Sequence, residues 1–122
     1  MSKHTISFKN ALRGISIALT TQTNLRIHFL IGSLVLVTAV YLSIPFAQIL
    51  LLILTIALVM LAEMINTSIE FFCNAITLEN NEDIKRAKDV SAGAVLISVI
   101  FATLIGLVIF IPQIINMLST KY

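Results

Sequence analysis

The chain has 122 residues, of which 58% are hydrophobic and only 11% are charged. A mean hydropathy of +1.02 does not fit a surface surrounded by water and predicts an integral membrane protein. The net charge of +2 is not gathered into a basic cluster, which argues against a nucleic-acid partner, and the single cysteine, Cys73, excludes an internal disulfide.

An amphipathic helix is predicted over about residues 6–22. Its apolar residues recur at helical spacing, at Phe8, Leu12, Ile15 and Leu19. Lys9 and Arg13 lie four residues apart on another side of that helix. We therefore expect the helix to lie on the membrane surface, with its basic residues against anionic head groups.

Three membrane spans are expected after this helix. Residues 27–62 and 90–120 contain no Asp, Glu, Lys or Arg, and each stretch exceeds the roughly 20 residues that a spanning helix needs. Pro45 interrupts the first stretch, which predicts a tight turn at residues 43–45. The predicted spans are about residues 26–42, 46–72 and 84–111.

The third span has recognisable ends and a patterned face. Asn81 or Asp83 is expected to cap its start, and Pro112 is expected to bend or end it. A stripe of small residues recurs at four-residue spacing, at Ala94, Ser98, Ala102 and Gly106. Such a stripe fits close packing within the chain and a subunit interface equally well.

Basic residues predict the orientation in the membrane. They precede the first and third spans, at Lys3, Lys9, Arg13, Arg26, Lys85, Arg86 and Lys88. The turn between the first two spans has none, and the far terminus has only Lys121. By the positive-inside rule, the N-terminus and the loop at residues 77–89 are expected in the cytoplasm.

Three polar residues near the end of the second span share one helical face. At about 100° per residue, Asn66 and Glu70 lie within about 60° of Glu63. Carboxylates near hydrocarbon persist chiefly where they pair, bind ions or carry out proton chemistry. One interpretation is therefore an ion network that locks the helices together, with basic partners drawn from Lys85, Arg86 and Lys88.

The same cluster of basic residues supports a chemical interpretation. Carboxylates that hold a divalent ion, together with a lysine that neutralises phosphate oxygens, form a minimal site for phosphoryl transfer. The basic residues are equally typical of a simple topology signal. His28 alone is more typical of a hydrogen-bonding residue at the interface than of a base. The four glycines are scattered and form no P-loop or Rossmann motif.

Two segments carry a family resemblance. The segments AEMINTSIE at 62–70 and AKDVSAGAVL at 87–96 resemble the two signature segments of the bacterial diacylglycerol kinase and undecaprenol kinase family. The resemblance extends from about residue 7 to about residue 114. The segments at 24–28 and 106–112 resemble the undecaprenol kinase branch more than the diacylglycerol kinase branch.

The resemblance implies a homotrimer with composite active sites at the subunit boundaries, and ATP and Mg²⁺ as cosubstrate and metal. It implies that Glu63 contacts the lipid hydroxyl and accepts its proton, that Asn66 supports the site, and that Glu70 ligates the metal. The implied nucleotide contacts are Lys88, Asp89, Glu79, Asn10 and Arg13. Arg26 is expected to help bind the lipid substrate.

The resemblance departs from the family pattern at two positions. Gln22 stands where many members have a metal-binding glutamate, and Asn74 stands where many have an aspartate. An amide can ligate Mg²⁺ through its oxygen but supplies no negative charge. Gln22 is therefore a candidate metal ligand that would bind the ion more weakly than a carboxylate.

The sequence predicts an all-α, multi-pass enzyme of the cell membrane, with residues 1–122 forming one lipid kinase domain and an active site on the cytoplasmic side. The branch resemblance favours undecaprenol as the acceptor. Diacylglycerol is the alternative, because both lipids offer a primary hydroxyl at the interface and the sequence separates them poorly. An ion-coupled transporter is a more distant alternative, although transport favours a glutamate near mid-span. A non-catalytic assembly subunit is another, but it leaves the shared face of Glu63, Asn66 and Glu70 unexplained.

Overall fold

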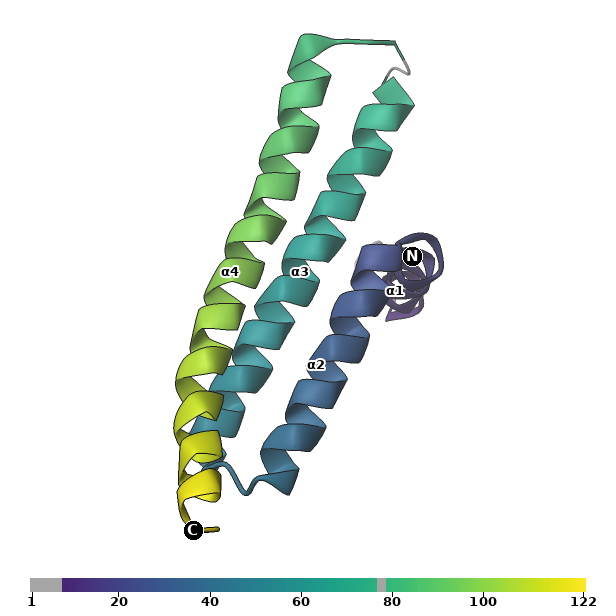
Figure 1. Ribbon diagram of the computed structural model, residues 1–122. Helices are drawn as coiled ribbons and strands as arrows, with labels where there is room; N and C mark the ends of the chain where they lie inside the picture. The colour runs from purple at the N-terminus through teal and green to yellow at the C-terminus, as the bar shows by residue number, and fades with distance from the viewer. Residues whose placement is uncertain (1–7, 77–78) are drawn as a thin grey trace.

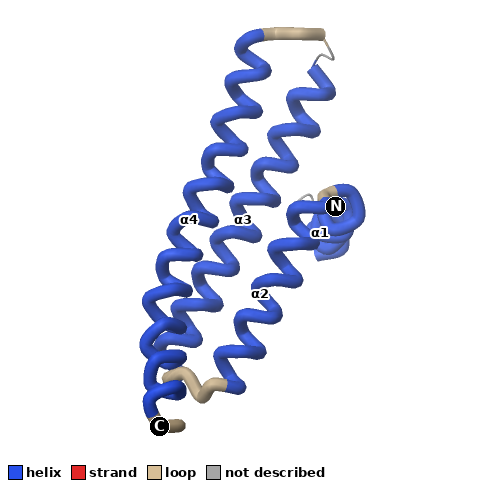
Figure 2. The backbone as a smooth tube through the Cα atoms, in the orientation of Figure 1, coloured by secondary structure: helices blue, strands red, loops and turns tan. Residues whose placement is uncertain are grey.

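The computed structural model describes residues 8–76 and 79–122, and these residues are almost entirely helical (Figures 1 and 2). They form the helices α1 (Phe8–Thr21), α2 (Thr23–Tyr41), α3 (Phe46–Ile76) and α4 (Glu82–Ser119). Within this part of the chain, α2, α3 and α4 are long and apolar enough to cross a membrane. The predicted all-α membrane fold with three spans is confirmed.

The three long helices run side by side, and α1 lies beside the start of α2, where it contacts α2 and α3 (Figure 1). The turn between α2 and α3 lies at one end of the bundle, which we call the turn end. The end of α3 and the start of α4 lie at the other, which we call the loop end. Large apolar side chains such as Phe29, Val37 and Val108 are exposed, as expected where the solvent is lipid.

The turn at residues 43–45 is where the sequence predicts it. Ser43 has a φ of 54°, a left-handed conformation that reverses the chain direction. Ile44 follows it into a buried cluster with Ala39, Leu52 and Ile109. The cluster packs α2, α3 and α4 against one another at the turn end, away from the polar residues near the loop end.

Two helix ends differ from the prediction. Helix α3 continues to Ile76, four residues beyond the predicted end at 72, because the segment after Phe72 contains no glycine or proline and the buried Cys73 packs there. Helix α4 continues through Pro112 to Ser119. Proline removes one backbone hydrogen bond, and the apolar sequence on both sides keeps the helix favourable in lipid.

The start of α4 is capped by Asn81, one of the two predicted caps. Its Oδ1 accepts hydrogen bonds from the backbone N–H groups of Asp83 and Ile84, at 2.9 and 3.2 Å. The predicted first helix is described from Phe8 to Thr21, and residues 6 and 7 of the predicted range 6–22 lie outside the described residues.

The length of α3 decides where its polar residues lie. Its 31 residues extend about 46 Å at about 1.5 Å per residue, whereas a hydrocarbon core is about 30 Å thick. A span of about 20 residues that starts at Phe46 reaches Ile65. Glu63 would lie at the boundary of such a span, and Glu70 and Asn74 would lie beyond it.

Candidate active site

The most buried carboxylate in the described chain belongs to Glu63 of α3. Its side chain is 5% exposed, and its Oε1 lies 3.1 Å from Nε2 of His28 on α2. The His28 side chain is 25% exposed, so it forms the more accessible side of the pair. The carboxylate of Glu63 is thus paired across the helices with an imidazole, and not with the basic cluster at the start of α4.

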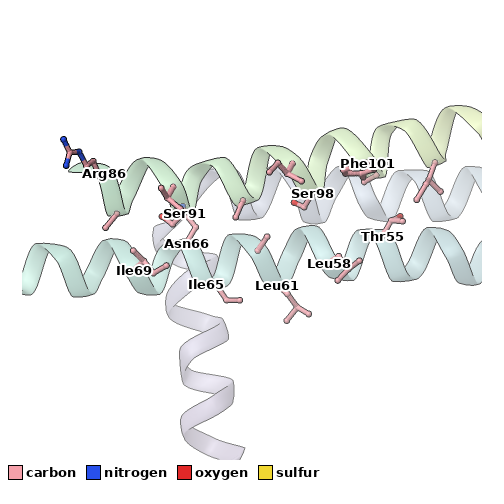
Figure 3. A pocket seen from close by; sticks show the side chains of 17 residues that line it. Thr55, Leu58, Leu61, Ile65, Asn66, Ile69, Arg86, Ser91, Ser98 and Phe101 are labelled. Carbon is pink, nitrogen blue, oxygen red and sulfur yellow. Dashed lines mark hydrogen bonds between the residues drawn. The ribbon is translucent and has the colours of Figure 1, made fainter. Parts of the chain in front are cut away.

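A second cross-helix contact joins α3 to α4. Ser91 Oγ donates a hydrogen bond to Oδ1 of Asn66 at 2.7 Å, and Asn66 Nδ2 donates to Oε1 of Glu70 at 3.3 Å. Ser91 is 6% exposed, and its side chain and that of Asn66 meet between the two helices (Figure 3). Since Ser91 occupies the amide oxygen, the amide N–H of Asn66 is turned toward the carboxylate of Glu70.

A third contact lies closer to the loop end. Lys88 Nζ donates a hydrogen bond to Oδ1 of Asn74 at 2.7 Å. Both side chains line a polar pocket of about 560 Å³, together with Glu79 and Lys85. Asn74 thus accepts a hydrogen bond from Lys88 without carrying a charge. The family resemblance predicts an aspartate at this position in many members.

Asp89 is not brought to this pocket with Lys88. Adjacent residues of a helix point about 100° apart, and Asp89 Oδ2 instead lies 2.9 Å from Nζ of Lys85. Both members of that pair are well exposed. Arg86 forms similar surface pairs with Glu82 and Asp83, so the basic cluster of α4 is largely paired within its own helix.

The remaining predicted site residues lie on α1 or at its junction with α2. Asn10 and Arg13 are exposed on α1. Gln22 lies between the two helices, and its Nε2 donates to Oγ1 of Thr21 at 3.3 Å. Arg26 donates to the Thr20 carbonyl at 3.4 Å, which holds the junction. The structure therefore does not join these residues directly to Glu63 or Glu70 within one described chain.

Two apolar hollows adjoin the polar residues. A groove of about 970 Å³ runs between α3 and α4, with Asn66 and Ser91 near one end and side chains such as Leu58 and Phe101 farther along (Figure 3). The small residues of the α4 stripe, apart from Gly106, line this groove. A cavity of about 400 Å³ lies between α2, α3 and α4, and His28 lies among its lining residues.

Among the described residues, no three His, Cys, Asp or Glu side chains gather into a group that could hold a metal ion, so a magnesium ion here would need further oxygens from a nucleotide or from water. Mg²⁺ in nucleotide sites is commonly held by one or two carboxylates, by substrate phosphates and by water. The hydrogen bond from Asn66 occupies only part of the accepting capacity of Glu70, whose ionised carboxylate has about four lone-pair sites. Glu70 therefore keeps oxygen lone pairs that such an ion could use together with the phosphates of a nucleotide.

Sequence reasoning missed two members of the site. The sequence pattern favours an interfacial role for His28, whereas the side chain contacts Glu63. It gives no role to Ser91, whose hydroxyl donates a hydrogen bond to Asn66. Both contacts join different helices, so periodicity within one helix does not reveal them. One sequence feature does point to them. Each is a polar residue in a largely apolar helix, near the end at which α3 carries its acidic residues.

Comparisons with known proteins add independent information. The family model described as "Prokaryotic diacylglycerol kinase" matches residues 9–110. The chain is 34% identical over 114 residues to "Diacylglycerol kinase" of Synechocystis sp., a match that covers 93% of this chain and 65% of that protein. It is 32% identical over 107 residues to "Undecaprenol kinase" of Bacillus subtilis, with coverage of 88% and 87%. The chain thus spans just under two thirds of the length of the Synechocystis relative.

Proposed function

The chain belongs to the prokaryotic diacylglycerol kinase family, and from this premise we propose that it is an ATP-dependent kinase of a membrane lipid alcohol. One observation supports the proposal above all. Glu63, Glu70 and Asn74 follow one another on a single face of α3, from the membrane boundary outward, with Lys88 bound to the last of them. In this order, the proposed base lies closest to a membrane-anchored hydroxyl, and the proposed phosphate-binding residues lie where a water-soluble nucleotide can reach them.

In the proposed reaction, Glu63 accepts the proton of the lipid hydroxyl as that oxygen attacks the γ-phosphorus of ATP. Its position at the membrane boundary is where the head of a lipid alcohol would lie. A positioned base of this kind contributes about 10²- to 10⁴-fold to the rate. The carboxylate is the proton acceptor, and ADP is the leaving group.

The phosphates would lie farther toward the loop end. Glu70 would hold Mg²⁺, which when bound supplies positive charge that neutralises the phosphate oxygens. Asn66 keeps the carboxylate of Glu70 oriented. Lys88 would exchange its contact with Asn74 for the developing negative charge on the transferred phosphoryl group. Glu79 lines the same polar pocket and, with Asp89, Asn10 and Arg13, is proposed to contact the nucleotide.

The whole assembly is proposed to be a homotrimer in the cell membrane, with α1 on its cytoplasmic surface. A trimer would allow α1 of one subunit to bring Asn10, Arg13 and Gln22 to the site of another. The exposed apolar residues of α1, Phe8 among them, would then lie in the interface between head groups and acyl chains. The N-terminus, the loop end and the active site would share the cytoplasmic side.

Undecaprenol is the acceptor that we propose, with diacylglycerol as the second candidate. The relative named undecaprenol kinase is matched over 87% of its length, and the segments at 24–28 and 106–112 resemble that branch. The test is competition between the two lipids at equal mole fraction in mixed micelles with ATP and Mg²⁺. We expect undecaprenol to be phosphorylated preferentially, and preferential phosphorylation of diacylglycerol would reverse the assignment.

Replacing Ser91 tests the proposed role of Asn66. Ser91→Ala removes the hydrogen bond that orients the Asn66 amide, so the Mg²⁺ concentration for half-maximal activity should rise by roughly two- to tenfold, equivalent to the about 0.5–1.5 kcal/mol of one hydrogen bond. Ser98→Ala is the matched control, because Ser98 lies on the same helix and bonds only to the Val95 carbonyl. Equal behaviour of the two variants would contradict the proposed role.

A further inference from the structure

The contact between His28 and Glu63 has features of a functional pair. It joins α2 to α3, whereas the pairs of Lys85 with Asp89 and of Arg86 with Glu82 and Asp83 lie within the first turns of α4. Its 3.1 Å separation allows a hydrogen bond between Nε2 and Oε1. An ionised carboxylate can only accept, so Nε2 carries the proton when the two groups bond.

Close packing of the two helices holds His28 in this position. A Cβ atom built on Gly32 would lie 2.7 Å from Cγ2 of Ile56 on α3, closer than real Cβ contacts allow. Gly32 therefore lets α2 approach α3 at this level. His28 lies about one helical turn from Gly32, and Glu63 about two turns from Ile56, so both contacts belong to the same antiparallel seam.

The geometry points to a specific role for the imidazole. We propose that His28 is a positioning residue, which binds Oε1 of Glu63 and thereby presents Oε2 to the hydroxyl of the lipid alcohol. The inference rests on the proposed role of Glu63 as the base. A glutamate has three rotatable side-chain bonds, and a misplacement of about 1 Å at a reacting group can lower a rate by about 10²-fold.

The burial of the two side chains supports positioning as the role of His28. The Glu63 carboxylate is almost completely buried, and a buried charge requires a partner. The imidazole supplies that partner from the side of α2, at Oε1, and the proposal assigns Oε2 to the substrate hydroxyl. An aliphatic residue at position 28 would remove the contact while preserving the apolar surroundings.

The test compares two substitutions that differ in one property. His28→Gln keeps an N–H donor close to the position of Nε2 but cannot accept a proton at working pH, and His28→Leu removes the donor. The rate at saturating ATP and lipid, the KM for ATP and the thermal unfolding midpoint are measured in the same micelles. We expect His28→Leu to lower kcat by about tenfold or more, with the KM for ATP changed by less than about twofold, and His28→Gln to recover most of the loss.

A double-mutant cycle with Glu63→Gln separates positioning from an independent effect. If His28 acts through the Glu63 carboxylate, adding His28→Leu to Glu63→Gln should lower kcat by less than about twofold further. Additive losses would overturn the proposal. So would a His28→Gln variant no more active than His28→Leu, since the imidazole would then be handling the proton itself.

Failure of the proposed function would look different from failure of this inference. A wild-type protein that transfers no phosphate to either lipid would contradict the kinase assignment. An active wild type whose kcat is unchanged in a folded His28→Leu variant, as judged by the unfolding midpoint, would contradict only the role of His28. An active Glu63→Gln variant would instead remove the base on which the inference rests.

Discussion

Glu63→Gln is expected to lower the turnover number by about 10²- to 10⁴-fold, while the magnesium dependence changes little. Glutamine preserves the shape of the side chain and can still contact His28, but it cannot accept the proton of a hydroxyl. Because the proposed metal ligand is Glu70, the nucleotide and its metal should bind normally. The measurement is lipid phosphorylation at saturating lipid and ATP, over a range of magnesium concentrations.

Asp83→Asn provides the matched control for loss of a carboxylate. Asp83 is well exposed, and it contacts Arg86 on the surface of α4, where a single ion pair contributes at most about 1 kcal/mol. Its turnover should remain close to that of the wild type. Near-normal turnover of Glu63→Gln at saturating magnesium would show that Glu63 is not the base.

Glu70→Gln is expected to raise the magnesium concentration needed for half-maximal activity by about tenfold or more. The substitution retains an oxygen that can ligate the ion but removes the negative charge that attracts it. Glu63 cannot replace it directly, because the two residues are separated by about 10 Å of rise along a straight helix. Saturating magnesium should restore much of the turnover, unlike in Glu63→Gln.

Glu63→Gln and Glu70→Gln serve as controls for each other. Both lose one carboxylate on the same face of α3, so a general electrostatic effect would change them alike. Separate roles predict a change in turnover for Glu63→Gln and a change in magnesium requirement for Glu70→Gln. If both variants shift only the magnesium requirement, the two carboxylates form a single electrostatic site and the division of roles is wrong.

The spans could be predicted because they depend on simple physical requirements. Apolar stretches long enough to cross hydrocarbon, interrupted by Pro45, determine where α2 and α3 begin and end near the turn. Hydropathy reports contact with lipid, not helix length, so it does not detect that α3 continues to Ile76, beyond the predicted end at 72. The expectation that proline bends or ends a helix gives Pro112 too much weight, since one missing N–H does not end a helix flanked by apolar residues.

From helical periodicity, the candidate site could be predicted only where its residues share a helix. Glu63, Asn66 and Glu70 follow from the helical period, and Lys88 from the resemblance to known family segments. The contact between Ser91 and Asn66 joins residues 25 positions apart and depends on how α3 and α4 are aligned. The contact between His28 and Glu63 depends in the same way on the close approach of α2 to α3 at Gly32.

Phosphate transfer itself is the most direct test of the central claim. The purified wild-type protein is incubated in mixed micelles with Mg²⁺, with ATP labelled at its γ-phosphate, and with undecaprenol or diacylglycerol. The proposed reaction predicts that label enters a lipid monophosphate, with one ADP formed for each phosphate transferred. Label that appears only as inorganic phosphate, or a folded protein that labels neither lipid, would contradict the assignment as a lipid-alcohol kinase.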